Sequence, residues 1–374
     1  MPSFYGPFFC SRILKAHRSL RFEDGGLIIK YVRKPPCGAP HPRTEKERNK
    51  TMQQRPIMPI FFATDDGYAP ALGVALASLL DNVSDGYDLR IHILTTGLTP
   101  ENTAALRETV GERATLAFVD MKERIAELEG RLALRNYYSS ATYLRLFIAE
   151  MFPEYDKALY LDCDIVINGD VTELFEAPIG DDLVAAIPED VMARIDLFGR
   201  YVEVCLDIPR AEYFNAGILT MNLAAFRAER ILERFVALLS RRRYVVTQDQ
   251  DYLNVLCRGK VTFLPDTWNT SPLETEDVGI PALVHYKLDR KPWHYRDVRF
   301  GEYFWQYAKE TPYFAALEQI CDSFGEEGIA RDRASYESLV KLAEKEIADE
   351  PALRAAKLRR RPTRRETMCA RTSA

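Results

Sequence analysis

The stretch Ala158–Asn168 limits what this chain can fold into, because two acids interrupt the apolar run of a buried strand. Alanine, leucine, tyrosine, isoleucine and valine fill the run, as expected for a strand covered on both faces. Burying Asp162 and Asp164 is costly unless their charge is compensated. Residues i and i+2 of a strand point to the same side, so both carboxylates are predicted to project together, with Cys163 facing away. Two adjacent oxygen donors suit a hard divalent cation, Mn²⁺ or Mg²⁺, and such an ion suits a diphosphate; a pair of turn-capping aspartates is the alternative.

Composition excludes several classes of protein. The 374 residues are enough for a full hydrophobic core, and 47% hydrophobic and 28% charged residues are ordinary for a globular protein. A net charge of −5 gives no overall attraction to nucleic acid. No apolar run approaches the roughly 20 residues that cross a bilayer. The seven cysteines are scattered without a Cys-x-x-Cys pair, which predicts free thiols in a reducing cytoplasm.

The two ends of the chain differ from its middle. Residues 1–56 show no sustained periodicity and include a proline-rich stretch, so they are predicted to be a disordered extension. Residues 301–374 are predicted to be a helical region that ends in a basic tail. Arginines dominate Arg354–Arg371, which predicts either a solvated end or peripheral contact with the anionic inner face of the membrane.

Residues 57–300 alternate between strand and helix patterns. Met58–Thr64 is a predicted strand, Pro70–Asn82 a helix, and Tyr87–Leu94 the next strand. This order predicts an α/β domain with a doubly wound sheet, which binds ligands at the carboxyl ends of its strands. Further strands are predicted at Ala114–Val119, Leu183–Ile187, Phe214–Asn222, Lys260–Leu264 and Ala282–Tyr286, a long helix at Leu223–Arg241, another helix from Gln248, and irregular structure at Val191–Tyr213.

Several short segments in this domain fit one known pattern. In chain order they are Phe62–Tyr68 (FATDDGY), Thr142–Arg145 (TYLR), Leu159–Asp164 (LYLDCD), Tyr213–Gly217 (YFNAG), Gln248–Asn254 (QDQDYLN), His285–Tyr286 and Lys291–Trp293 (KPW). Together they resemble the retaining glycosyltransferases of family 8, which include bacterial lipopolysaccharide galactosyl- and glucosyltransferases and, more distantly, glycogenin. The resemblance runs from about Pro59 to about Tyr295. It implies a single Rossmann-like nucleotide-sugar-binding domain of the GT-A type, with a mixed, mostly parallel central sheet and a helical C-terminal extension.

The resemblance implies a UDP-sugar donor bound with Mn²⁺. Ala63, Asp65 and Tyr68 are expected at the end of the first strand, where Asp65 accepts from the uracil N–H and Tyr68 stacks on the ring. Taken alone, the segment favours a core aromatic that caps its helix. Arg145 is expected to hold the donor sugar or to pair with the carboxylates, whereas a lone arginine is usually a surface residue.

The resemblance also implies the metal ligands. Asp162 and Asp164 are expected to hold the ion with His285 as the third protein ligand. A lone histidine at a strand end is more often structural, and the Lys291-Pro-Trp sequence that follows favours the ligand role. Lys291 and the ion are expected to neutralise the departing diphosphate as negative charge builds on it.

Four polar residues are expected around the donor sugar: Asn215, Asp190, Asp249 and Gln250. Gln250 matches the family position nearest the anomeric carbon, on the face opposite the diphosphate. Because a glutamine amide is a poor nucleophile, front-face attack is favoured over a covalent intermediate, with the departing phosphate oxygen as the base.

The chain departs from the family pattern in two places. The family usually carries a glycine shortly after the His-Tyr pair, whereas Lys287–Arg290 reads Lys-Leu-Asp-Arg. The diphosphate contact of that loop is therefore expected from Lys287 or Arg290, or the loop closes differently. Gly67 stands where relatives often carry an amide residue, which removes one uridine contact.

The function that the resemblance implies is transfer of a hexose from UDP-galactose or UDP-glucose to a glycan or lipopolysaccharide-type acceptor, and no nucleic-acid partner is expected. The acceptor is expected at residues 191–213 and the C-terminal helices. One alternative is a nucleotidyltransferase that forms nucleotide sugars, although its glycine-rich, lysine-bearing loop is missing near the first strand. Another is a catalytically silent binding module, although Asp162, Asp164, His285 and Lys291 are all retained.

Overall fold

The structure is a computed structural model that describes residues 20–23, 26–29, 55–128, 130, 132, 140–273 and 278–359. The chain divides into two units, Met1–Gln54 and Arg55–Ala374. In the first unit, β1 (Leu20–Glu23) and β2 (Gly26–Ile29) pair as an antiparallel hairpin. The rest of the extension predicted to be disordered lies outside the described residues apart from Arg55 and Pro56, and so does the end of the basic tail.

The second unit is built on a mixed sheet that has seven strands among the described residues, in the order β10-β8-β9-β6-β3-β4-β5. Strand β9 is antiparallel to both of its neighbours, and the other pairs are parallel. A two-stranded antiparallel ribbon, β11-β7, lies outside this sheet. The strands are β3 (Ile57–Thr64), β4 (Asp88–Thr95), β5 (Thr115–Asp120), β6 (Lys157–Leu161), β7 (Ile165–Ile167), β8 (Val184–Pro188), β9 (Phe214–Asn222), β10 (Val261–Phe263) and β11 (Leu283–His285).

The first half of the domain follows the predicted β-α-β-α-β order. Strand β3 pairs along its whole length with β4, and β4 pairs with β5. Helix α2 (Ala69–Asn82) is buried along most of its length, and α3 (Pro100–Val110) starts at Thr99, whose hydroxyl accepts from the Asn102 N–H. Phe61 and Phe62, adjacent in β3, belong to different hydrophobic clusters, so the sheet has an apolar core on each face.

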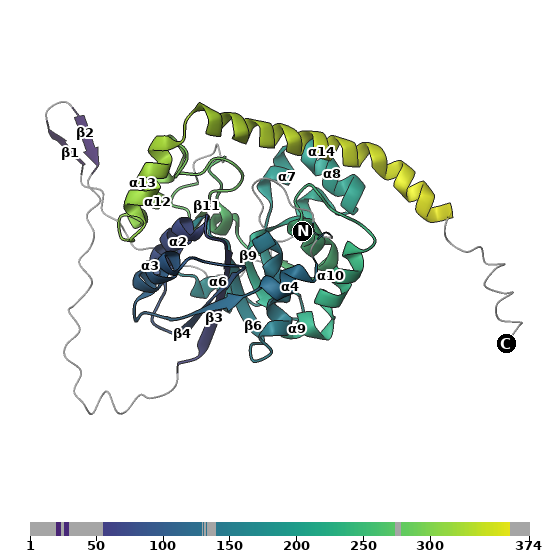
Figure 1. Ribbon diagram of the computed structural model, residues 1–374, viewed down its shortest axis with the longest axis horizontal. Helices are drawn as coiled ribbons and strands as arrows, with labels where there is room; N and C mark the ends of the chain where they lie inside the picture. Colours follow the sequence, from purple (N-terminus) through teal and green to yellow (C-terminus); the bar gives the residue numbers. More distant parts are fainter. Residues whose placement is uncertain are drawn as a thin grey trace, which may run out of the picture. The chain divides into compact units, whose positions relative to one another are not determined.

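Short helices connect the later strands, and longer ones follow the last strand (Figure 1). Helix α14 (Glu326–Arg359) packs against α8 and the π-helical turn Val202–Leu206. No helix in the described part of the chain is long and apolar enough to cross a membrane. The other helical segments are α4 (Lys122–Ala126), η1 (Ser140–Phe147), α5 (Ile148–Met151), α6 (Thr172–Glu176), α7 (Asp190–Arg194), α8 (Asp196–Tyr201), η3 (Arg210–Glu212), α9 (Leu223–Ala228), α10 (Ile231–Leu239), α11 (Asp249–Leu256), η4 (Asp266–Asn269), α12 (Gly301–Ala308) and α13 (Phe314–Ser323).

Three predicted elements differ from the structure. The stretch Ala158–Asn168 is two strands, β6 and β7, with the aspartates in the break between them. The single long helix predicted at Leu223–Arg241 is split into α9 and α10, because Arg230 adopts a left-handed backbone with φ 56°. The region predicted as irregular, Val191–Tyr213, is mostly short helices packed on the sheet.

The cysteines within the described residues carry free thiols. Cys163, Cys205, Cys257 and Cys321 are buried and unpaired by disulfides. The Cys163 thiol donates to the backbone oxygen of Ala63 at 3.1 Å, and Cys163 also lines the cavity described below. The other three cysteines fall outside the residues that the structure describes.

Candidate active site

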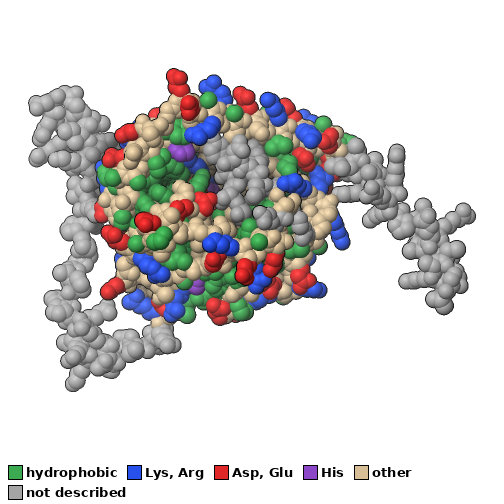
Figure 2. Space-filling model, viewed as in Figure 1, with side chains coloured by type: hydrophobic (Ala, Val, Ile, Leu, Met, Phe, Trp, Pro, Cys, Tyr) green, Lys and Arg blue, Asp and Glu red, His purple; other side chains and the backbone are tan. Residues whose placement is uncertain are grey.

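A cavity opens at the edge of the sheet that was predicted to bind ligands. Residues following β3, β6 and β8 line it, together with the start of β9, because β9 runs antiparallel and brings its first residues to the same edge. Its volume is about 1420 Å³, counting space open to solvent. Figure 2 shows the hollowed face below α14, bordered by hydrophobic side chains. The predicted metal, donor and catalytic residues line this cavity except Asp190, and of the two loop cations considered, Lys287 lines it and Arg290 does not.

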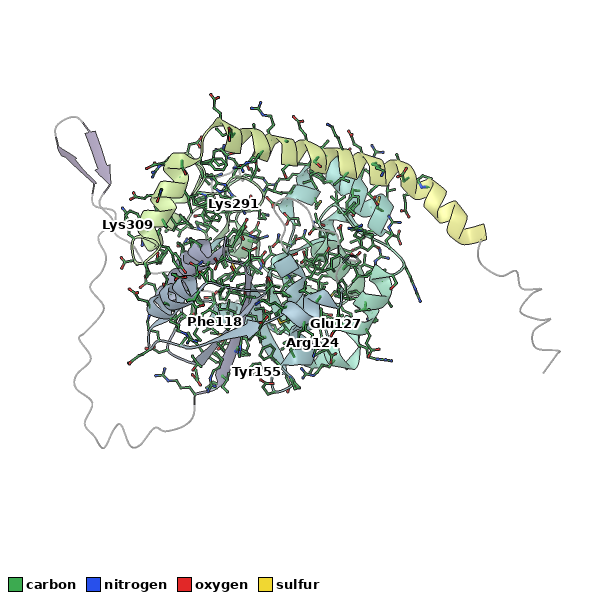
Figure 3. The ribbon with its side chains drawn as sticks, in the orientation of Figure 1. Phe118, Arg124, Glu127, Tyr155, Lys291 and Lys309 are labelled. Atoms are coloured by element: carbon green, nitrogen blue, oxygen red, sulfur yellow. The ribbon has the colours of Figure 1, made fainter. Side chains whose placement is uncertain are left out.

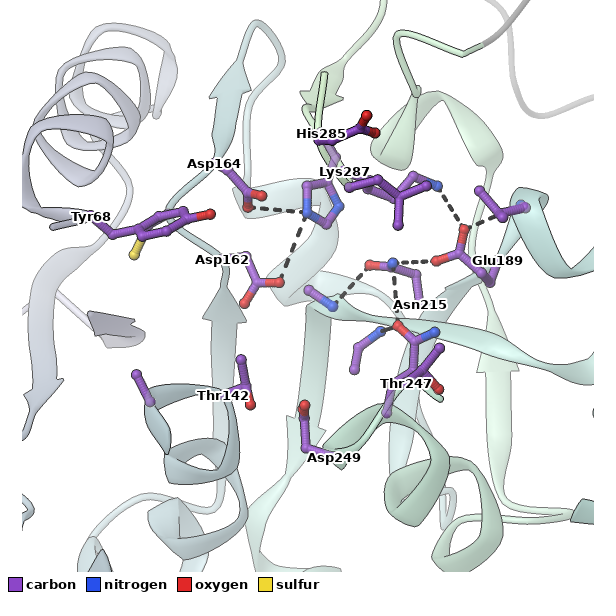
Figure 4. Close-up of a pocket in the computed structure, with 18 of the residues that line it drawn as sticks. Tyr68, Thr142, Asp162, Asp164, Glu189, Asn215, Thr247, Asp249, His285 and Lys287 are labelled. Carbon is purple, nitrogen blue, oxygen red and sulfur yellow. Dashed lines mark hydrogen bonds and ion pairs between the residues drawn. The ribbon is translucent and has the colours of Figure 1, made fainter. Parts of the chain in front are cut away.

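Three potential metal ligands meet at one corner of the cavity. The ligand atoms of Asp162, Asp164 and His285 all lie within 4.8 Å of one another. His285 Nε2 is 3.2 Å from Asp164 Oδ1 and 3.8 Å from Asp162 Oδ2 (Figure 4). Atoms that share an ion at about 2.1 Å lie at most about 4.2 Å apart, so both of these distances fit a common cation.

The donor chemistry of this corner also fits a cation. His285 Nδ1 is 2.8 Å from the side-chain oxygen of Asn269, which accepts the Nδ1 proton and leaves the Nε2 lone pair facing the two carboxylates. Three electron-pair donors facing one another repel unless a positive charge lies between them. A residue that orients a ligating histidine through its other nitrogen is a usual feature of metal sites. Asn269 was not predicted from the sequence.

The local backbone explains why the carboxylates meet the imidazole. The Asp162 N–H donates to the Gly217 carbonyl at 2.8 Å, and β11 pairs antiparallel with β7, which sets His285 opposite Ile165. A Cβ at Gly217 would lie 2.5 Å from Asp162 Oδ2 and 2.6 Å from His285 Cε1. Glycine is therefore required at this position for the corner to form.

Two buried cations compensate the paired carboxylates. Lys291 Nζ lies 2.5 Å from Asp164 Oδ2 and donates to the Tyr286 carbonyl (Lys291 is labelled in Figure 3). Burial raises the pKa of Asp164, but the Lys291 ammonium group outweighs burial and holds that pKa well below its ordinary value. Arg145 Nη2 donates to Asp162 Oδ1 at 3.0 Å.

Arg145 is a buried residue, which excludes the surface role that a lone helical arginine usually has. Its side chain is 3% exposed and also lies 3.1 Å from Asp249 Oδ2, with its guanidinium over the Tyr160 ring. Burial disfavours its charge, yet Asp162, Tyr160 and Asp249 together raise the pKa of Arg145. Of the two predicted contacts, the structure shows the pairing with carboxylates.

The predicted nucleoside side is formed by the turn after β3. Asp65 Oδ1 accepts from the Tyr68 N–H at 3.1 Å, and Tyr68 is the N-cap residue of α2. The Tyr68 ring also lines the cavity, edge-on to Trp293 at 6.1 Å between ring centres. Tyr68 is therefore the helix cap that was considered, and its ring also borders the cavity, while stacking on a uracil ring stays a prediction. Ala63 lines the cavity beside them.

The residues predicted around the sugar are held by one another. Gln250 Oε1 accepts from the Ala216 N–H at 2.9 Å, and Asn215 Oδ1 accepts from the Gly217 N–H at 2.9 Å. Burial raises the pKa of Asp249 to about 6, against the opposing effect of Arg145. These side chains present amide and carboxylate groups in fixed orientations, as recognition of sugar hydroxyls requires.

The structure adds a buried ion-pair cluster at the end of β8. Lys287 Nζ lies 2.8 Å from Glu189 Oε1 and also pairs with Asp190, while Asn215 Nδ2 donates to Glu189 Oε2 at 2.5 Å. Glu189 rather than Asp190 lines the cavity, although both residues follow β8. The place of Glu189 directly after a predicted strand was the sequence signal that could have identified it. Burial raises the pKa of Glu189, but Lys287, Asp190 and Asn215 outweigh it and lower the pKa to about 2.

The glycine-free loop closes in the conformation that glycine favours. Leu288 has φ 58°, in the left-handed region, and its side chain packs against the hydrophobic core. Of the two cations considered for a diphosphate contact, Lys287 lines the cavity and pairs with Glu189. Arg290 pairs with Asp297 at 3.1 Å and does not line the cavity. Lys291 is thus the basic residue of this loop that stands beside the metal corner.

Known proteins are similar to this chain in sequence. A lipopolysaccharide 1,3-galactosyltransferase of Salmonella typhimurium is 27% identical over 68% of this chain and 78% of its own length. General stress protein A of Bacillus subtilis is 26% identical over 67% of this chain and 94% of its own length. A lipopolysaccharide 1,2-glucosyltransferase of Escherichia coli is 27% identical over 63% of this chain and 72% of its own length.

Solved structures show the same fold. An active-site mutant of LgtC superposes with a TM-score of 0.60 and 29% identity, over 68% of this chain and 96% of that one. The bifunctional glycosyltransferase WbbM gives a TM-score of 0.63 and 25% identity. The match covers 72% of this chain but only 52% of WbbM. The galactosyltransferase LgtC has also been solved with donor and acceptor sugar analogues, with a TM-score of 0.55 and 28% identity over 68% of this chain and 96% of that one. The family model for glycosyl transferase family 8 matches residues 59–297, and the chain belongs to that family.

Proposed function

We propose that this chain transfers a hexose from UDP-galactose or UDP-glucose to a hydroxyl group of a glycan or lipid-linked sugar, with retention of anomeric configuration. The observation that carries the proposal is the corner where Asp162, Asp164 and His285 converge beside Lys291. It lies in the same cavity as Asp65 and the Tyr68 ring. A nucleotide with two phosphates spans such an arrangement, with its base at the aromatic wall and its phosphates at the corner.

Asp162, Asp164 and His285 are the residues that would hold Mn²⁺, with Mg²⁺ as the second choice. When bound, the cation supplies positive charge to the diphosphate oxygens and so stabilises the leaving group. The short contact between Lys291 and Asp164 supports a related role for Lys291. Its ammonium group would supply a second positive charge beside a diphosphate bound at this corner.

Front-face attack is supported by how Gln250 is held. Its Oε1 already accepts from the Ala216 N–H and its Nε2 lies 3.4 Å from the Tyr213 hydroxyl, so the amide is fixed as a hydrogen-bonding group rather than as a nucleophile. Asp249 is turned toward Arg145 at 3.1 Å. In this proposal the acceptor oxygen forms its bond to the anomeric carbon as the phosphate oxygen leaves. The acceptor's proton passes to that leaving oxygen.

The relatives support the chemical class of the acceptor. Two are named as transferases that build lipopolysaccharide, one for galactose and one for glucose, which is why both donors are retained here. LgtC carries both a donor and an acceptor analogue in one structure. In this chain the donor-site residues and residues of α7, α8 and α14 line one cavity, so the proposed donor and acceptor sites adjoin.

The test is release of UDP from UDP-galactose and UDP-glucose with Mn²⁺, with Mg²⁺, and with chelator. We expect slow Mn²⁺-dependent hydrolysis in the wild type and its loss in Asp164→Asn. The matched control is Asp156→Asn, because Asp156 precedes the other end of β6 and is 87% exposed. Hydrolysis that persists in chelator or in Asp164→Asn refutes the proposal.

The same preparation distinguishes the alternatives. A nucleotidyltransferase releases pyrophosphate from UTP and a sugar 1-phosphate, whereas the proposed enzyme does not. A silent binding module binds UDP-sugar in calorimetry without releasing UDP. Retention is read from the anomeric proton coupling of the product by NMR, and an inverted product refutes that part of the proposal.

A further inference from the structure

The cavity has a second wall that the donor site does not use. In Figure 4, Tyr68 and Glu189 lie on opposite sides of Asp162 and Asp164. The proposed nucleoside site is on the Tyr68 side. On the Glu189 side the lining continues into helices α7 and α8 and across to α14, which packs against α8.

This second wall is made mainly of apolar side chains. Val191 and Met192 come from α7, Phe198 from α8 and Leu339 from α14, and all four belong to one hydrophobic cluster. They are at most 8% exposed, so their positions are set by packing within the protein before any ligand arrives. We call these four residues, together with Tyr336, the apolar wall.

Tyr336 makes the wall accessible to a ligand. It lies on α14, lines the cavity, and is 39% exposed, whereas most large hydrophobic side chains of the domain are buried. Nearby Asp332, by contrast, is 3% exposed and accepts a hydrogen bond from the Tyr295 hydroxyl at 2.7 Å. The acid is therefore already engaged within the protein, and the tyrosine ring is the accessible surface.

The chemistry of the wall determines what can lie against it. Valine, methionine, leucine and phenylalanine side chains offer sugar hydroxyls no hydrogen-bond partner of normal strength. A hydroxyl desolvated against them costs about 1–3 kcal/mol, while each buried methylene gains about 0.8 kcal/mol. Apart from Asp289 and the α14 residues Asp332 and Ser335, the polar groups that line the cavity belong to the donor site and the Glu189 cluster. A hexose therefore fits there, and an apolar group fits against Val191, Met192, Phe198, Leu339 and Tyr336.

We propose that the acceptor carries an apolar group next to its accepting sugar, an alkyl or aryl aglycone, and that the apolar wall binds this group. The inference rests on the proposed function, since it assigns the acceptor side of the same cavity. It makes α14 part of the substrate site, with Tyr336 as a specificity-determining residue.

The test compares acceptors that differ only in the aglycone. Methyl, butyl and phenyl β-galactosides, β-glucosides and β-lactosides are assayed with the active donor. We expect kcat/KM to rise about tenfold or more from the methyl to the butyl glycoside. Butyl adds methylene groups, and burying one methylene strengthens binding roughly fourfold. A higher kcat/KM for the butyl than for the phenyl glycoside indicates a lipid-like group on the acceptor, and the reverse order indicates an aromatic group. Equal kcat/KM for all three overturns the inference.

Variants on α14 locate the effect. Tyr336→Ala is expected to lower kcat/KM for the preferred apolar glycoside about fivefold more than for the methyl glycoside, and Tyr336→Phe to retain the preference. The matched control is Ile329→Ala, because Ile329 is on the same helix, is 40% exposed and does not line the cavity. An unchanged preference in Tyr336→Ala overturns the assignment to this wall.

Failure of this inference is distinguishable from failure of the proposed function. UDP release without acceptor reports on the donor site alone. If UDP is released but no glycoside is glycosylated, binding of the methyl, butyl and phenyl glycosides is measured by calorimetry with UDP and Mn²⁺ present. The same order of affinities is expected, and equal or undetectable binding of all three overturns the inference while the donor chemistry stands.

Discussion

Asp249 is a carboxylate that this fold keeps at a cost to its stability, and that cost is measurable. Burial raises its pKa from 3.8 to about 6, although Arg145 lies 3.1 Å away. The guanidinium does not offset the whole desolvation cost because it also serves Asp162. Replacing Asp249 by asparagine keeps the shape of the side chain and removes its ionisation.

The sign and size of the effect follow from linkage. A carboxylic acid with a raised pKa binds its proton more tightly in the folded state, so stability falls as pH rises from 3.8 through about 6. Above that range the loss is complete and amounts to about 3 kcal/mol. Asp249 is the first residue of α11, where the helix dipole favours a negative charge by about 0.3–1 kcal/mol. We therefore expect Asp249→Asn to be about 2 kcal/mol more stable than wild type at pH 7.5.

The assay is urea unfolding at pH 7.5 and pH 4.5 in chelator, so that no metal alters the charge at Asp162. The gain from Asp249→Asn should narrow at pH 4.5, where folded wild type is already protonated. Asp297→Asn controls for removal of a charge, because that side chain is 80% exposed and should show no comparable gain. A variant less stable than wild type at pH 7.5, or a gain that does not depend on pH, would refute the reasoning.

Three further outcomes are expected. Gly217→Ala should lower Mn²⁺-dependent UDP release about tenfold or more, because its Cβ would lie 2.5 Å from Asp162 Oδ2; Gly86→Ala, with no atom within 4 Å of its Cβ, should leave release unchanged. Glu189→Gln should lower the free energy of unfolding by about 2–3 kcal/mol at pH 7, because ionised Glu189 stabilises the fold. Urea titrations should show this difference from wild type shrinking as the pH falls from 4.5 toward 2, where Glu189 of the folded protein becomes protonated. Leu288→Gly should be about 1 kcal/mol more stable than Leu288→Ala, since only glycine relieves the left-handed backbone; equal unfolding midpoints would contradict this.

Some of the site was predictable because its residues stand at strand ends in the sequence. Asp65 after β3, Asp162 after β6 and Glu189 after β8 reach the cavity by the ordinary rule for open α/β sheets, although Glu189 was overlooked in favour of Asp190. The start of β9 reaches the same edge for a different reason, since that strand runs antiparallel. A mixed, mostly parallel sheet was predicted, and the structure confirms it.

Other features have no local signal. The apolar pattern of Leu223–Arg241 is continuous, yet the chain breaks at Arg230, where tertiary packing overrides helix periodicity. The loop after β11 lacks glycine but still adopts a left-handed turn at Leu288. The C-terminal helices were expected to border the acceptor, but nothing near Tyr336 in the sequence singles out this side chain, because its contact with the cavity depends on where α14 crosses α8.

The sequence by itself determined the α/β class, the order of the elements and the acids at the ends of strands, because strand periodicity and short-range spacing are local properties. Only the tertiary structure decided that His285 faces Asp162 and Asp164, that Lys287 forms an ion pair with Glu189, and that α14 completes the cavity. Those contacts join residues far apart in the chain. Their geometry is set by the direction of β9, the pairing of β11 with β7 and the packing of buried side chains, none of which a local pattern encodes.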